Sequence, residues 1–177
     1  MASDQAPAQR RQPTDAEARA LASSLRLRIL RLCYDEDLTN KQIADRLGVD
    51  PGSSLHHIRR LVGTGFLAPL PVRRGQRGAR ERPYRGTGKS WALDVQPAGG
   101  VTAAAVGAFL GEASEVDPTE VRWVRRALRL RADDMHALWS ELENVVNRYI
   151  ERERPDGQPC ALFAALYPRT PAGDTEP

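Results

Sequence analysis

The amino-acid sequence predicts a mainly α-helical protein with one small β-hairpin. Three observations support this fold class. Apolar residues recur at three- and four-residue spacing over residues 18–62, two extended segments flank a polar tip at residues 73–82, and a second helical pattern covers residues 135–154. With 177 residues, 41% of them apolar and 28% charged, the chain is long enough for one domain and an appendage or for two small domains.

The first helix follows a polar arm. Residues 1–13 are rich in Ala, Gln and Pro, which predicts a disordered arm. Asp15 can cap the helix that follows, and we expect about five turns ending near residue 32. Its apolar positions are Ala18, Leu21, Ala22, Leu25, Ile29 and Leu32.

Two further helices are joined by a short turn. Thr39 and Gln42 have the spacing of a capping box, and Gly48 stops the helix that they begin. Asp50 as N-cap and Pro51 at the first helical position begin the next helix, which Gly residues end after residue 62. This arrangement is that of a helix-turn-helix.

The hairpin follows directly. Residues 66–72, 83–87 and 91–93 are predicted to be extended, and the polar tip RRGQRGARER lies between the first two of these segments. A helix-turn-helix followed by a basic hairpin is a winged helix, so we predict a winged helix-turn-helix domain over residues 14–95.

After this domain the composition changes. We predict a C-terminal helical region over residues 101–167, and its best pattern is the helix of residues 135–154. The remaining segments are a linker at 96–100, short helices at 102–111 and from Pro118 onward, an apolar run at 160–167 that is open between strand and helix, and a polar tail at 168–177.

The net charge of +3 conceals two oppositely charged blocks. Residues 21–93 hold 14 basic and six acidic residues, net +8, whereas residues 94–177 hold nine and 14, net −5. The basic block indicates a polyanionic partner. No apolar run is long enough for a membrane span, so we expect a cytoplasmic protein with no membrane partner.

Basic and polar side chains gather on two of the predicted elements. Ser53, His56, His57 and Arg60 share one face of the helix that begins at Pro51, where they offer donors to base edges and phosphates. Six arginines lie within residues 73–85, a segment that we call the wing: Arg73, Arg74, Arg77, Arg80, Arg82 and Arg85. Because these like charges repel one another without a polyanion, the wing predicts phosphate or minor-groove contact.

Residues 21–87 resemble the winged-helix domain of ArsR-type bacterial transcriptional regulators. The matching motifs are L-x-x-x-x-R-x-x-I-L, L-T-x-x-x-I-A-x-x-L-G-V, H-H-I-R-x-L, and G-F-L before a basic wing that ends Y-R-x-T. The resemblance implies a homodimeric repressor on operator DNA, although Leu55 stands where the family usually has a serine. The DNA-contacting residues that we predict are Thr39, Lys41, Gln42, Ser53, Ser54, His56, His57, Arg59, Arg60 and the six wing arginines.

Neither metal binding nor catalysis is predicted. The cysteine pair of metal-sensing relatives is absent, since Cys33 stands alone, and Cys33 and Cys160 are both expected to be buried thiols. Asp134 and His136 provide only half of the family's other metal site. The sequence contains no G-x-S-x-G, Walker or H-E-x-x-H motif, so we expect neither an enzyme nor a cofactor.

The C-terminal helix carries an apolar stripe with two interpretations. The favoured one is a self-complementary dimer seam, which would place two recognition helices about 34 Å apart, one turn of DNA. The alternative is a small-molecule effector pocket that also includes Phe109 and Trp123. The stripe consists of Met135, Leu138, Trp139, Leu142, Val145, Val146 and Tyr149.

We therefore predict a sequence-specific, homodimeric DNA-binding regulator, more often a repressor than an activator in this family. The rival hypothesis is a winged-helix protein-interaction module whose basic wing docks an acidic protein surface.

Overall fold

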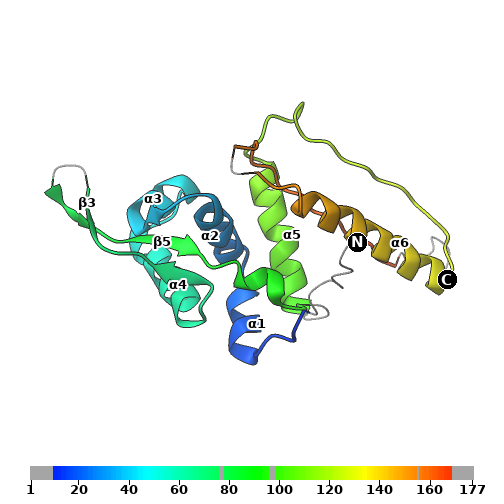
Figure 1. Cartoon of the computed structure of the whole chain (residues 1–177), viewed down its shortest axis with the longest axis horizontal. Helices are drawn as coiled ribbons and strands as arrows, with labels where there is room; N and C mark the ends of the chain where they lie inside the picture. Colours follow the sequence, from blue (N-terminus) through cyan, green and yellow to red (C-terminus); the bar gives the residue numbers. More distant parts are fainter. Residues whose placement is uncertain (1–9, 76–77, 96–98, 155, 169–177) are drawn as a thin grey trace, which may run out of the picture. The chain divides into compact units, whose positions relative to one another are not determined.

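The computed structural model describes residues 10–75, 78–95, 99–154 and 156–168, which form two compact units divided after Val121. Figure 1 labels most of the elements. Those of the first unit are α1 (Asp15–Leu21), α2 (Ser24–Asp35), β1 (Leu38–Thr39), α3 (Asn40–Leu47), α4 (Pro51–Gly63), β2 (Leu67–Pro69), β3 (Arg73–Arg74), β4 (Arg80–Glu81), β5 (Pro83–Gly86), the 3-10 helix η2 (Lys89–Ala92) and α5 (Gly99–Ala113).

The single helix predicted from residue 15 is two helices. Ser23 has extended backbone angles (φ −155°, ψ 121°), and its side chain accepts a hydrogen bond from the Arg26 amide, so α1 ends and α2 begins there. The N-cap also differs from the prediction. Thr14 caps α1 in a capping box with Glu17, and Asp15 is the first helical residue.

The predicted helix-turn-helix is present. Thr39 and Gln42 form the capping box of α3, and Gly48 ends this helix in the left-handed conformation (φ 63°). The Asp50 side chain caps α4 by accepting hydrogen bonds from the amides of residues 52 and 53. The Asn40 side chain donates to the Pro51 carbonyl (2.9 Å), which ties the start of α3 to the start of α4.

Two small antiparallel sheets follow the helices. β1, β5 and β2 form one sheet in that order, with Leu38 opposite Tyr84 and Ala68 opposite Arg85. β3 and β4 form a separate hairpin, which Figure 1 shows extending beyond the helices of this unit. Residues 83–86 are extended as predicted and form β5, whereas residues 91 and 92, also predicted to be extended, belong to η2, and Leu93 forms a β-bridge with Arg11. Residues 10–13 are therefore ordered, contrary to the predicted arm, whereas residues 1–9 lie outside the described residues.

The core of the first unit gathers around α2. Its fully buried side chains include Ile29, Ile43, Ile58, Leu61 and Phe66. Cys33 is also buried, as predicted, and burial raises the pKa of its thiol to about 12. Cys160 is exposed, contrary to the prediction.

The helix predicted at 102–111 is confirmed as α5, but it packs on α1 and α2. Val101, Ala104 and Ala108 are its buried residues. Gly107 permits the close approach, because a Cβ at this position would lie 3.3 Å from Ser24 Cβ. The first compact unit therefore extends to residue 121, beyond the domain boundary predicted at residue 95.

The second unit contains one described helix, α6 (Ala132–Ile150), which matches the predicted C-terminal helix. The helix predicted from Pro118 is not formed, since residues 118–120 are a turn and 121–131 have no regular structure. Residues 160–167 are neither strand nor helix. None of the described helices is long and apolar enough to span a membrane.

Candidate nucleic-acid interface

α4 presents a polar face to solvent. Ser53, His56, Arg59 and Arg60 are exposed on it, whereas Ile58 and Leu61 are buried on its other side. Because the Asp50 cap and the bond from Asn40 fix the start of the helix, this face has a defined direction relative to α3. A helix so presented offers hydroxyl, imidazole and guanidinium groups to the edges of base pairs.

His57 does not share the exposed face fully. It is half-buried, and its Nδ1 lies 3.4 Å from Nη1 of Arg26 on α2. Burial, together with the charge of Arg26 and the neighbouring His56, lowers the pKa of His57. Since a guanidinium can only donate, Nδ1 is the acceptor, and a neutral His57 carries its proton on Nε2.

Two predicted DNA-contacting residues are corrected by their burial. The Ser54 side chain is 0% exposed, because it lies on the same helical stripe as Ile58 and Leu61 and faces the core. Thr39 is 6% exposed, and its hydroxyl accepts the amide of Gln42. Thr39 caps α3, and the burial of both side chains argues against contacts with DNA from these places.

The start of α3 is more accessible. Gln42 is exposed, although its side-chain oxygen accepts the Thr39 amide (2.9 Å). The Lys41 side chain is 79% exposed and pairs with Asp45 at 2.6 Å. An exposed ion pair of this kind contributes less than about 1 kcal/mol, so a phosphate can compete for Lys41.

The wing is a narrow hairpin with an arginine-rich surface. Arg73, Arg74, Arg80, Arg82 and Arg85 are all exposed, and Arg77 lies outside the described residues. The Gly75 amide donates to the Ala79 carbonyl (2.8 Å), and Gly78 adopts φ 77° near the tip.

Charges are unevenly distributed across the hairpin. Arg73 is opposite Glu81, whereas Arg74 is opposite Arg80. Two like charges directly opposite each other on antiparallel strands are destabilising. A bound polyanion would remove this repulsion.

Arg85 has a partner within the protein. Its guanidinium forms an ion pair with Asp37, just before β1, and this contact holds the pKa of the Asp37 carboxyl below its ordinary value. Arg85 therefore links β5 to the segment before β1. The Asp37 carboxylate partly compensates the charge of Arg85.

A buried carboxylate, not anticipated from the sequence, joins α1 to the segment before it and to η2. Glu17 is 5% exposed and accepts hydrogen bonds from Arg11 (2.6 and 2.9 Å) and from the Thr14 amide (2.8 Å), and it forms an ion pair with Lys89 (2.7 Å). Lys89 also donates to the Thr64 carbonyl just after α4 (2.7 Å). Because the N-cap was assigned to Asp15, the capping box of Thr14 and Glu17 was missed, and no local signal indicated the distant partner Lys89.

The apolar stripe of α6 is only partly covered within the described residues. Met135, Trp139, Leu142 and Val146 are half-buried, and Leu138, Val145 and Tyr149 are 40%, 40% and 64% exposed. Trp123, assigned to the alternative effector pocket, is 76% exposed. The described residues contain no group of three or more side chains that could hold a metal ion.

The comparison with known families agrees with the geometry of the first unit. Residues 21–69, which span α2 to β2, match the family model described as a helix-turn-helix domain. No curated protein matches the chain. The protein therefore carries a helix-turn-helix domain, the class of domain that DNA-binding transcriptional regulators use.

Proposed function

We propose that the protein is a sequence-specific, homodimeric transcriptional regulator of the ArsR type that represses genes by binding operator DNA. The observation that carries the proposal is the pairing of two polar surfaces in one unit: the exposed face of α4 and the arginines of the wing.

In this proposal α4 reads the bases of the major groove. Arg59 offers paired donors that suit guanine, and Ser53 and His56 offer single contacts one to two turns earlier on the helix. Neutral His57 supports α4 from the side of α2 and keeps one ring proton for a contact at the edge of the groove.

The wing contributes affinity without sequence preference. Its exposed arginines neutralise phosphates of the flanking backbone, or insert into the adjacent minor groove, and the counterions so released make binding strongly salt-dependent. The repulsion between Arg74 and Arg80 in the free protein favours this role over that of an ordinary solvated surface.

A second copy of the chain would pair along α6. The partly exposed apolar stripe of this helix supports self-association, and two-fold symmetry would bring two α4 helices to successive turns of DNA.

The decisive experiment is selection of bound sequences from random duplex DNA by the purified full chain. We expect an inverted repeat whose half-sites lie about 10 base pairs apart, centre to centre. Placing that repeat between a promoter and a reporter should lower expression when the protein is present. Failure to enrich any sequence, together with binding to acidic proteins, would instead favour the protein-interaction module.

A further inference from the structure

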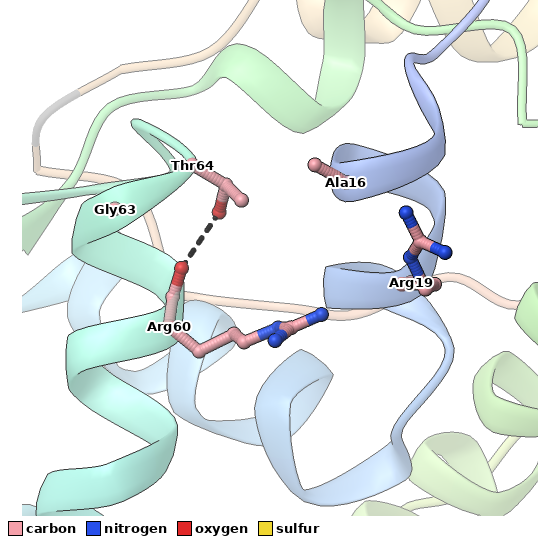
Figure 2. Close-up of a pocket in the computed structure, with 5 residues that line it drawn as sticks. All are labelled: Ala16, Arg19, Arg60, Gly63 and Thr64. Atoms are coloured by element: carbon pink, nitrogen blue, oxygen red, sulfur yellow. Dashed lines mark hydrogen bonds between the residues drawn. The ribbon is translucent and has the colours of Figure 1, made fainter.

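A pocket of about 350 Å³ lies between α1 and the C-terminal end of α4. Ala16 and Arg19 line it from α1, and Arg60, Gly63 and Thr64 line it from α4 and the residue after it. Figure 2 shows the Arg60 side chain extending from α4 toward α1, with the Arg19 guanidinium on the opposite wall. The two charged groups thus border the same space.

The pocket is positively charged. None of the described residues that line it is acidic, and no ion pair of Arg19 or Arg60 occurs within the described part of the chain. The carboxylate of Glu17, also on α1, is already held by Arg11 and Lys89. Nothing within the described pocket therefore compensates the two guanidiniums.

A third guanidinium strengthens the positive field. Arg26 donates to the Arg19 carbonyl (2.7 Å) and so fixes the end of α1 that carries Arg19. Burial and, to a smaller extent, the nearby charge of Arg60 lower the pKa of Arg26. An anion bound beside Arg60 would reduce this repulsion.

The pocket also continues the polar face of α4. Arg60 lies two helical turns after Ser53 on the same side. The Thr64 hydroxyl donates to the carbonyls of Arg60 (2.9 Å) and Leu61 (3.2 Å), so the negative carbonyl end of the helix is capped where it meets the pocket. A Cβ built on Gly63 would have no neighbour within 4 Å, which shows that this wall is open.

We propose that this pocket binds a phosphoryl group held between the guanidiniums of Arg19 and Arg60. The planar guanidinium group of arginine matches the geometry of phosphate oxygens, and it stays protonated at neutral pH. The phosphoryl group has two possible sources. If it belongs to the DNA backbone at the end of α4, the inference rests on the proposed function. If it belongs to a free phosphorylated small molecule, the inference is independent of that function.

The first arm of the test measures DNA binding as a function of salt. We would titrate the full chain with a mixed-sequence duplex and compare the wild type with Arg19→Ala and with Arg129→Ala, a matched loss of one exposed charge in the second unit. If the ligand is a backbone phosphate, Arg19→Ala lowers the slope of log affinity against log salt by about one, and the control leaves it unchanged. Ala16→Glu, which adds a carboxylate at an exposed position one turn before Arg19, should act in the same direction without removing an arginine.

The second arm uses pyrophosphate without DNA. If the site takes a free ligand, pyrophosphate raises the Tm of the wild type above that in sodium chloride of equal ionic strength, and Arg19→Ala loses this increase while its salt slope on DNA stays unchanged. An unchanged slope together with no specific pyrophosphate effect overturns the proposal. If the wild type binds no DNA at any salt concentration, the proposed function fails, and the pyrophosphate arm alone then decides the pocket.

Discussion

Arg74 and Arg80 lie directly opposite each other on the two strands of the wing hairpin. Cross-strand pairs of like charge destabilise a sheet by a few tenths of a kcal/mol or more, and a two-stranded ribbon has little packing to offset this. A pair that weakens the free protein is therefore best explained by a bound state in which phosphates lie close to both guanidiniums.

This arrangement predicts opposite effects on folding and on binding. Replacing both arginines by Ala should leave the stability of the free protein unchanged or slightly higher. The same change should weaken binding to every DNA sequence and lower the salt slope by about two. Fluorescence titrations at several salt concentrations, beside thermal melts, measure both effects.

A double replacement in the second unit, Arg122→Ala with Arg129→Ala, is the control for net charge, since both residues are exposed. If the wing and control variants show the same slope, the wing does not contact phosphates.

Neighbouring serines on α4 predict a second contrast. Ser53 is exposed, whereas Ser54 is fully buried and its hydroxyl has no hydrogen-bond partner within the described residues. Ser53→Ala should cost about 1 kcal/mol on the selected operator and almost nothing on unrelated DNA. Ser54→Ala should leave both affinities unchanged and alter stability by no more than about 1 kcal/mol, because it removes an unpaired buried hydroxyl. If Ser54→Ala loses operator affinity and Ser53→Ala does not, Ser54 contacts DNA after all, despite its burial.

Burial of Glu17 predicts how stability depends on pH. Arg11, Lys89 and the Thr14 amide hold the pKa of this carboxyl far below its ordinary value of 4.5. Glu17 therefore stabilises the fold fully above pH 4.5, and its contribution falls as pH drops below that value, because the unfolded state then binds the proton more readily than the folded state.

Glu17→Gln should destabilise the protein by about 1–3 kcal/mol at pH 7, since Arg11 and Lys89 lose their partner but still reach solvent. The difference from wild type should shrink at pH 3, as urea unfolding at the two pH values would measure. Asp45→Asn, which breaks the exposed pair with Lys41, is the control and should change stability little at either pH. A difference that is the same at both pH values would show that the Glu17 carboxylate charge is not what stabilises the fold.

Local signals explain which parts of the fold were predictable. The capping box of Thr39, the left-handed Gly48 and the Asp50 cap each act within four residues, so the sequence alone indicated α3 and α4 correctly. The break at Ser23 was missed because the apolar spacing continues across it, and only the backbone angles of Ser23 change, from helical to extended.

The candidate site divides in the same way. Exposure of Ser53 and His56 followed from helical periodicity, and exposure of the wing arginines followed from their density in a polar segment that contains Gly. The side on which Ser54 falls, however, depends on how α4 packs against the core. The pairing of Glu17 with Lys89 and the meeting of Arg19 with Arg60 at one pocket join residues far apart in the chain, which periodicity cannot indicate. Tertiary packing decides such contacts.

The apolar stripe of α6 provides the last prediction. Leu142 lies at the middle of the stripe and is half-buried, whereas Ser140 is an exposed polar residue of the same helix. If two copies pair along this stripe, Leu142→Glu places a charge in the seam and should yield a monomer in sedimentation, whereas Ser140→Glu should remain a dimer. A monomer engages one half-site at a time, so operator affinity should fall by about 100-fold or more, with a smaller loss on unrelated DNA. Circular dichroism must show that both variants keep their helices. A monomeric wild type, or a Leu142→Glu variant that stays dimeric, would mean that α6 is not the seam.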